Sequence, residues 1–395
     1  MNLSSPSSRL DDVAVELASS SVVGIGENSH GVAEFKRIPS LLVERLVEDH
    51  GYRLLAIEAT LGDFAPVNSY LMGETNDLDS ALSSTEFYFW RADGIERLFE
   101  RLREFNDGRP ADDRVEVRGY DAQFTSVNGT AIREYLNRVD SDYLATIDDS
   151  LTPLTKPLHN RSGASYLTDS RVDFLEELRT RLRTHESAYV AESSQARWRL
   201  ARRHVWTLER GLQFLEELSA ENYTRGKTIR DRTMAENVAW LREWTGSDRA
   251  VVLGNANHTM RGYGEDGQRA ARMGQHLSDE LGSDYYTLGM TFGTGRFAAP
   301  GDGHGEFSVH DIDGPTDGTL AATLVDVDEP ALFLDFETAR EHPRIEDWLT
   351  DTRSIQFTVP RAASRGAVAL PEAPRDVYDG VAFVRTVTPA SFLGD

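Results

Sequence analysis

The stretch Ser21-Val-Val-Gly-Ile-Gly-Glu27-Asn-Ser-His30-Gly31 decides the fold of this chain. An apolar run ends abruptly there in a carboxylate and an imidazole that are three residues apart. The sequence from Phe35 to Val47 then has apolar side chains at near-helical spacing, and Gly51 is suited to end that helix. Open α/β sheets place active sites in this way, with polar groups at the carboxyl end of a strand that precedes a helix. The stretch therefore predicts an α/β fold with functional side chains at a strand end.

The same arrangement recurs three times further along the chain. Apolar runs that begin at Leu54, Val115 and Ala250 each end in polar side chains. Because the carboxyl ends of parallel strands lie at one edge of a sheet, we expect these side chains to share a cleft. The expected set consists of Glu27, His30, Glu58, Asp121, Gln123 and His258. Ionisable groups gathered in a cleft indicate an enzyme.

The order of the expected elements defines the architecture. Residues 1 to about 125 alternate strands and helices, which is typical of a largely parallel sheet. Charged helices replace this pattern over about 130–139, 166–185 and 193–218, and the α/β pattern resumes with a helix over 229–244 and strands near residues 250, 285, 331 and 377. We predict one α/β domain over residues 1–395, with a largely parallel central sheet flanked by helices and an inserted helical lid subdomain over residues 129–225.

Acidic side chains dominate the charge of the chain. The 65 Asp and Glu residues outnumber the 42 Lys and Arg residues, for a net charge of −23. Such a surface repels nucleic acid and anionic membranes, so we expect neither as a partner. The lysines are Lys36, Lys156 and Lys227, which leaves 42 − 3 = 39 arginines. Many carboxylates with Arg in place of Lys resemble the composition of halophilic proteins, whose self-repulsion is screened in molar salt, where the Debye length is about 3 Å.

Several residue types and motifs are missing from the sequence. The chain has no cysteine, which excludes disulfides, thiolate metal sites and cysteine nucleophiles. The N-terminal residues lack the apolar core of a signal peptide and no apolar run approaches a membrane span, so we expect a cytoplasmic protein. No Gly-x-Ser-x-Gly motif is present, so Ser29 is expected to cap a helix and not to act as a hydrolase nucleophile.

Five short blocks occur in a fixed order along the chain. Residues 26–35 match G-E-x-x-H-G-x-x-E-F, residues 119–123 read G-Y-D-A-Q against G-F-D-x-Q, and residues 230–237 match R-D-x-x-M-A-x-N. Ile57-Glu58 and residues 378–383 match two further blocks. Together the blocks resemble those of the erythromycin esterase family, from about residue 20 to residue 390. The combined match is specific, although each block alone is weak.

The resemblance implies hydrolysis of an ester or lactone bond of a small molecule, without a serine nucleophile and without a cofactor. In that family the histidine of the first block is taken to be the general base that activates water, and His30 occupies that position here. A neutral imidazole accepts a proton from water near neutral pH. We expect Glu27 and Glu58 to orient this imidazole, and His258 and Arg230 to stabilise the oxyanion.

A second group of side chains is expected to contact the substrate: Asp121, Gln123, Arg230, Asn255 and Trp90. Structural hydrogen bonding is the alternative role for Asp121 and Gln123. Trp90 is expected first to pack against the inserted helices, with substrate contact as the alternative. Position 255 departs from the family block H-N-A-H, because Asn255 replaces the first histidine. An amide donates hydrogen bonds but carries no charge, so this departure argues against macrolide hydrolysis more than against the fold.

The sequence leaves other functions open. Glu27, His30, Glu58 and His258 are ligand types that could hold Zn²⁺ or Mn²⁺, and more distant relatives of the fold include metal-dependent peptidases and iron- or haem-handling proteins. A non-catalytic protein that binds a small molecule is a further alternative. The arginines of residues 197–203 are expected on a solvated helix face, with an anion site as the alternative.

Overall fold

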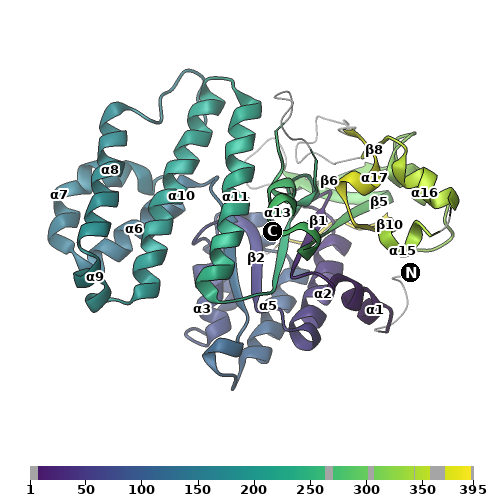
Figure 1. Ribbon diagram of the computed structural model, residues 1–395, viewed down its shortest axis with the longest axis horizontal. Coiled ribbons are helices and arrows are strands. Elements are labelled where there is room, and N and C mark those ends of the chain that lie inside the picture. The colour runs from purple at the N-terminus through teal and green to yellow at the C-terminus, as the bar shows by residue number, and fades with distance from the viewer. Residues whose placement is uncertain (1–7, 263–269, 301–306, 342, 356–369, 393–395) are drawn as a thin grey trace.

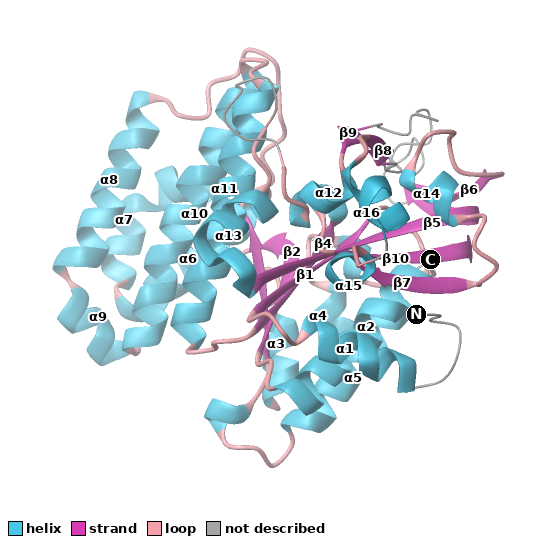
Figure 2. Ribbon diagram, turned by 45° about the vertical axis from the view of Figure 1, so that its right-hand side comes forward, coloured by secondary structure: helices cyan, strands magenta, loops and turns pink. Residues whose placement is uncertain are grey.

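A computed structural model describes residues 8–262, 270–300, 307–341, 343–355 and 370–392. Within them, an eight-stranded sheet forms the centre of the molecule (Figure 1 and Figure 2). Its strands lie in the order β3 (Glu116–Asp121), β2 (Leu54–Thr60), β4 (Ala250–Asn255), β1 (Val22–Glu27), β5 (Tyr285–Pro300), β10 (Gly380–Val387) and β7 (Ala331–Asp335), and β6 (Phe307–Ile312) pairs with β5. Neighbours from β3 to β10 are parallel, whereas β7 and β6 are antiparallel to their partners. The prediction of an α/β fold with a largely parallel sheet is confirmed.

Helices cover both faces of the sheet because its inner strands are apolar on both sides. Alternate side chains of a strand point to opposite faces. In β1, Val23 and Ile25 join one apolar core, while Val22 belongs to a second core. The first core includes α1 (Ser8–Leu17), α2 (Glu34–His50), α3 (Ala65–Met72), α4 (Leu78–Ser83) and α5 (Asp93–Asn106), and the second includes α11 (Tyr223–Thr245) and α13 (Met273–Leu281). This burial on both faces explains why the strands read as continuous apolar runs.

Consecutive helices fill the chain between β3 and β4, where the sequence predicts an insertion. Before α11 they are α6 (Thr125–Val139), α7 (Ser141–Leu151), α8 (Asp169–Thr184), α9 (Glu186–Glu192) and α10 (Gln195–Ser219). The helices α6 to α10 share an apolar core of their own, and α10 packs along both α6 and α11. They form a layer at the side of the sheet that β3 borders (Figure 1). That this layer acts as a lid stays a prediction.

Two helices of this region differ from the sequence prediction: α7 is absent from it, and α11 begins earlier than predicted. α7 was not predicted, because its polar sequence hides a buried face made by Tyr143, Leu144, Ile147 and Leu151. Its start is fixed by Asp140, whose side chain accepts a hydrogen bond from a backbone N–H of the first turn. α11 begins at residue 223 and not at 229, so the helix that reaches the sheet is one turn or more longer than the apolar pattern indicates.

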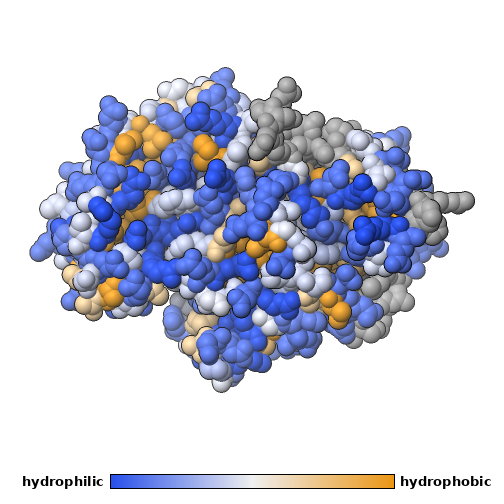
Figure 3. Space-filling view, viewed as in Figure 1, coloured by the Kyte–Doolittle hydropathy of each residue, from blue (hydrophilic) through white to orange (hydrophobic). Residues whose placement is uncertain are grey.

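Short elements complete the chain. They are α12 (Ala256–Thr259), α14 (Leu320–Leu324), α15 (Phe336–Ala339), α16 (Pro343–Thr350), α17 (Pro374–Val377), the hairpin of β8 (Arg353–Ile355) and β9 (Leu370–Glu372), and the 3-10 turns η1 (Tyr88–Trp90), η2 (Ala111–Asp113), η3 (Thr152–Thr155) and η4 (Gly282–Asp284). Among the described residues, no helix is long and apolar enough to span a bilayer. Figure 3 shows a face on which hydrophilic residues predominate, as the charge of the chain implies.

Candidate active site

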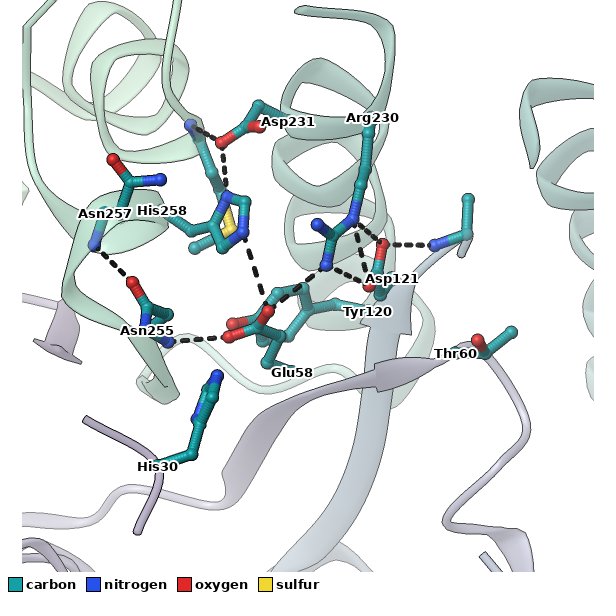
Figure 4. A network of polar contacts seen from close by, with 12 residues as sticks. His30, Glu58, Thr60, Tyr120, Asp121, Arg230, Asp231, Asn255, Asn257 and His258 are labelled. Carbon is teal, nitrogen blue, oxygen red and sulfur yellow. Dashed lines mark hydrogen bonds and ion pairs between the residues drawn. The ribbon is translucent and has the colours of Figure 1, made fainter. Parts of the chain in front are cut away.

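Four adjacent strands end at one edge of the sheet. β3, β2, β4 and β1 are neighbours in that order, and their register pairs Glu27 with Asn255 and Thr60 with Asp121. Glu58 lies near the end of β2, between these two pairs. Figure 4 shows that His30 points from the end of β1 toward the polar side chains of the other three strand ends. The structure therefore brings Glu27, His30, Glu58, Asp121 and His258 of the predicted set to one edge of the sheet.

The imidazole of His30 is held by Glu27, with 2.6 Å between Nδ1 and the carboxylate oxygen Oε1. The ammonium group of Lys36, on α2, donates to both oxygens of the same carboxylate, at 2.8 Å for Oε1 and 2.9 Å for Oε2. Burial raises the pKa of Glu27, but the charge of Lys36 and the hydrogen bond from His30 outweigh it, so that the pKa lies below its usual value. Burial lowers the pKa of Lys36, and the charge of Glu27 counteracts this. Glu27 is therefore ionised at neutral pH.

Aromatic rings border His30. Phe89 stacks on the imidazole with 4.4 Å between the ring centroids, and Phe87 meets it edge-on at 6.4 Å. Asp63, which follows β2, fixes the segment that carries both rings, because its carboxylate accepts the backbone N–H groups of Glu86 at 2.8 Å and Phe87 at 3.2 Å. The imidazole is thus oriented by a carboxylate at Nδ1 and by a ring on its face.

Trp90 lies behind the site. Its side chain is 2% exposed, its indole N–H donates to the backbone carbonyl of Glu58 at 2.8 Å, and the ammonium group of Lys36 lies 4.3 Å from the ring centroid. The ring belongs to the core that includes α2 and α5, so the expectation that it packs against the inserted helices is wrong. So small an exposed fraction also leaves almost no surface for a substrate, and Trp90 supports Glu58 and Lys36 instead.

Arg230, on α11, links the carboxylates of two neighbouring strand ends. Its guanidinium holds Asp121 with two nitrogens, Nε at 3.0 Å from Oδ1 and Nη2 at 2.6 Å from Oδ2, and Nη2 also lies 3.2 Å from Oε1 of Glu58. Burial lowers the pKa of Arg230, but the charges of Asp121 and Glu58 raise it above its usual value. Asp121 and Glu58 are buried, so this guanidinium replaces the solvent that would otherwise stabilise their charges.

His258 forms a second pair of a histidine and a carboxylate. Its Nδ1 lies 2.7 Å from Oδ1 of Asp231, the residue after Arg230 on α11. Burial raises the pKa of Asp231, but the contact with His258 lowers it below its usual value. The other ring nitrogen, Nε2, lies 3.6 Å from Oε1 of Glu58 (Figure 4). The expected role of Glu58 therefore needs correction, because its contacts are with Arg230 and the His258 side of the site, while Glu27 orients His30.

Asn255 joins the end of β4 to Glu58 through the backbone. Its N–H donates to Oε2 of Glu58 at 2.6 Å, and its side-chain oxygen accepts the N–H of Asn257 at 2.9 Å (Figure 4). The amide side chain is thus the N-cap of α12, the turn that carries His258. Gln123 is half-buried just after β3 and takes part in none of the contacts described above. Substrate contact by Asn255 or Gln123 stays a prediction.

Comparisons with known proteins show the family to which this chain belongs. The family model described as erythromycin esterase matches residues 47–387 of this chain. The chain belongs to the erythromycin esterase family. This membership supports a hydrolase.

Two relatives of this family member carry names of hydrolases. The chain is 23% identical to YbfO of Bacillus subtilis (strain 168), a protein named as a hydrolase, over 94% of this chain and 85% of that protein. It is 25% identical to erythromycin esterase type II of Escherichia coli over 70% of each chain.

Solved structures share the fold of this erythromycin esterase family member. A protein of Bacillus cereus has a TM-score of 0.82 at 18% identity, covering 99% of this chain and 94% of that one. A mutant of erythromycin esterase EreC in its open conformation has a TM-score of 0.70 at 15% identity, covering 97% of this chain and 95% of that one. These likenesses show that the α/β architecture is common to all three.

Sequence reasoning missed two side chains at the site, Lys36 and Asp231. Each lies in or beside a block that matches the erythromycin esterase family: Lys36 directly follows residue 35, and Asp231 directly follows Arg230. Lys36 also carried a second signal, because lysine is scarce in this chain. Neither signal reveals the partner, since Asp231 is 27 residues from His258 in sequence.

The side chains of the alternative metal site have protein partners in this family member. Among the described residues, no group of three or more His, Cys, Asp or Glu side chains is arranged to hold a metal ion. Glu27 contacts Lys36 and Glu58 contacts Arg230, so cationic side chains of the protein lie where a metal ion would approach these carboxylates.

Proposed function

We propose that this protein hydrolyses a carboxylic ester or lactone of a small molecule by means of a water molecule that His30 activates, without a serine nucleophile. The observation that carries the proposal is the 2.6 Å contact between Nδ1 of His30 and Oε1 of Glu27. An ionised carboxylate accepts hydrogen bonds only, so Nδ1 must carry the proton of this contact. The lone pair of the neutral imidazole is then on Nε2, which is free to take a proton from water.

Proton transfer to His30 creates an imidazolium beside Glu27. The carboxylate stabilises this cation, and Lys36 keeps the carboxylate ionised before the reaction begins. The activated water attacks the carbonyl carbon, and the carbonyl oxygen becomes an oxyanion. When the bond between the acyl carbon and the alcohol oxygen breaks, the imidazolium of His30 returns its proton to the leaving alkoxide. Water is thus divided between the acid and the alcohol, and the imidazole is neutral again.

The oxyanion requires hydrogen-bond donors at fixed positions. Arg230 uses Nε and Nη2 for Asp121 and Glu58, which leaves Nη1 as a donor toward a substrate. His258 is the second candidate, in its protonated form only: Asp231 accepts the proton on Nδ1, so Nε2 can donate to the oxyanion only when the ring is an imidazolium. Removal of one such donor typically costs about 10²–10³ in turnover, so each of these side chains is expected to have a measurable share.

The chemistry of the site and the family of this chain support an ester or lactone as the substrate class. Erythromycin esterase type II of Escherichia coli is named for a macrolide, at 25% identity to this chain. Asn255 replaces a histidine of the family's late block, which argues for an ester or lactone other than a macrolide. A metal-dependent hydrolase remains the alternative that the experiment below tests.

The test is a screen of ester and lactone substrates in molar KCl with the wild type and the His30→Ala variant. Removal of a general base typically costs about 10²–10⁴ in rate, so turnover should fall by that factor while the fold is retained. His159→Ala, at an exposed histidine, is the matched control and should keep full turnover. Hydrolysis that survives in His30→Ala would overturn the role of His30. Loss of turnover in EDTA, with recovery in Zn²⁺ or Mn²⁺, would favour the metal-dependent alternative.

A further inference from the structure

A cavity of about 460 Å³ lies among α8, α10 and α11, and it shares no lining residue with the candidate active site. Five arginines line it: Arg179, Arg183, Arg199, Arg202 and Arg203. Three of them belong to the arginine run for which the sequence leaves an anion site as an alternative. Glu176 is the acidic residue among its lining side chains. In a chain with a net charge of −23, this concentration of positive charge needs a separate explanation.

Ion pairs within the protein explain only part of this charge. Arg179 pairs with Glu176 and Glu209, and Arg199 pairs with Glu243 at 2.6 Å. The other three arginines, at positions 183, 202 and 203, form no ion pair with a carboxylate among the described residues. Acidic side chains are abundant on this chain, so unpaired arginines around one cavity are not a consequence of a shortage of partners.

Arg203 is the most constrained of the three. Its guanidinium carbon lies 3.7 Å from the ring centroid of Trp206 and 5.5 Å from that of Trp240. Its Nε donates to the side-chain oxygen of Asn237 at 2.7 Å, and Asn237 is itself fixed by a hydrogen bond to the backbone oxygen of Tyr120. The two rings and the amide hold the guanidinium in one orientation, so little side-chain entropy is lost when it binds a ligand.

One nitrogen of this guanidinium lacks an acceptor. Nη2 of Arg203 is buried and has no hydrogen-bond partner among the described residues. Burial lowers the pKa of Arg203 to about 10, and the charge of Glu236, which forms no ion pair with Arg203, counteracts this only in part. A buried donor that is left unpaired is costly, and a charged one more so. An anion in the cavity would supply both the missing acceptor and the missing charge.

We propose that this cavity is a second ligand site, which binds a small organic anion through its carboxylate or phosphate groups. The planar fork of a guanidinium matches both kinds of group and binds them with paired hydrogen bonds. Arg183, Arg202 and Arg203 together suit a ligand with two or three negative charges. The volume lies within the range of small-molecule sites, about 300–1,000 Å³. The net charge of −23 disfavours a polyanion such as nucleic acid as the ligand.

Calorimetric titration of the full chain tests the proposal, with citrate as the carboxylate probe and inorganic pyrophosphate as the phosphate probe. The titrations use the lowest KCl concentration at which circular dichroism shows a folded protein, because salt weakens the binding of ions. We expect one site per chain for at least one probe, with a change in tryptophan fluorescence from Trp206 and Trp240. The stronger of the two probes identifies the class of the ligand.

Variants locate the binding. Arg183→Gln and Arg203→Gln should each weaken Kd by about tenfold or more, because each removes a charge-assisted contact. Arg101→Gln makes the same change of charge at an exposed arginine of α5 and should leave Kd unchanged. Loss of Arg203, which lies between two tryptophans, could unfold the protein. Arg183 is exposed, so Arg183→Gln is expected to fold and still tests whether the anion binds in this cavity. Equal Kd values in all variants, or no heat with either probe, would overturn the proposal. His30→Ala should bind the probe with the same Kd as the wild type. Failure of the proposed hydrolysis and failure of this anion site are therefore distinguishable.

Discussion

The ammonium group of Lys36 lies within hydrogen-bond distance of both carboxylate oxygens of Glu27, at 2.8 Å and 2.9 Å. Both side chains are buried, so each supplies the counter-charge that solvent cannot. The oxygen Oε1 that accepts from Lys36 also contacts Nδ1 of His30. The tautomer of the proposed general base therefore depends on a lysine of α2, the helix that follows His30 in the chain.

Replacement of Lys36 by Met should impair the general base without touching it. Without the lysine charge, burial raises the pKa of Glu27, and a protonated Glu27 accepts the Nδ1–H bond more weakly and has no charge to stabilise the imidazolium. We expect kcat/KM to fall by about 10²-fold or more near neutral pH. The ionised form of Glu27 is the active one, so the acid limb of the profile of kcat/KM against pH should move to higher pH.

Lys227→Met is the matched control for this variant, since Lys227 is exposed on the same helix as Arg230. Stability provides a second measurement. Loss of one partner leaves a buried charge uncompensated, which costs about 3–5 kcal/mol. The double variant Glu27→Gln/Lys36→Met should therefore unfold at a higher temperature than Lys36→Met alone. An unchanged acid limb in Lys36→Met would show that Lys36 does not govern Glu27.

Asp63 should make the stability of the protein depend on pH. Burial raises its pKa to about 6, although the N–H groups of Glu86 and Phe87 favour the ionised form. The folded protein thus binds this proton more tightly than the unfolded chain, so the contribution of Asp63 to stability falls as pH rises from about 4 to about 6. Asn at position 63 does not titrate. In thermal melts at constant salt, the free energy of unfolding of Asp63→Asn relative to the wild type should rise by up to about 3 kcal/mol from pH 4 to pH 6. A difference between the two proteins that does not change with pH would contradict the raised pKa of Asp63.

The composition predicts that the fold requires salt. Repulsion among 65 acidic side chains, against 42 basic ones, opposes compaction when it is not screened. The thermal midpoint should therefore be higher in molar KCl than in dilute buffer. Molar sucrose, which is uncharged, serves as a control for effects of cosolute that do not depend on charge. Equal midpoints in dilute buffer and molar KCl would contradict the halophilic interpretation.

The sequence predicts the strands and their polar ends because apolar runs and the residues after them are local signals. It does not predict contacts between distant elements. The pair of His258 and Asp231 requires that α11 and the end of β4 meet, and the stacking of Phe89 on His30 requires that the segment fixed by Asp63 fold back over β1. For the same reason the sequence does not show that Trp90 packs into the core that includes α2 and α5 instead of against the inserted helices.

Asn255 is the position where the sequence departs from the family, and the structure adds a constraint on its replacement. Its side chain is the N-cap of α12, which carries His258, whereas its link to Glu58 is through the backbone N–H. Loss of an Asn cap costs about 0.5–2 kcal/mol, but the link to Glu58 survives any substitution other than proline. Asn255→Ala loses the cap without gaining an imidazole and is therefore the matched control for Asn255→His.

If the missing imidazole limits macrolactone cleavage, Asn255→His should raise the hydrolysis of erythromycin above that of both the wild type and Asn255→Ala. The gain should disappear in Asn255→His/His30→Ala, because a second imidazole assists a reaction that His30 still begins. Mass spectrometry of the ring-opened product measures the hydrolysis of erythromycin. Cleavage of a small ester that the wild type also cleaves shows that each variant is folded and active. Erythromycin hydrolysis that stays at background in Asn255→His, while the small ester is cleaved normally, would place the choice of substrate in the helices inserted over residues 129–225 instead of at position 255.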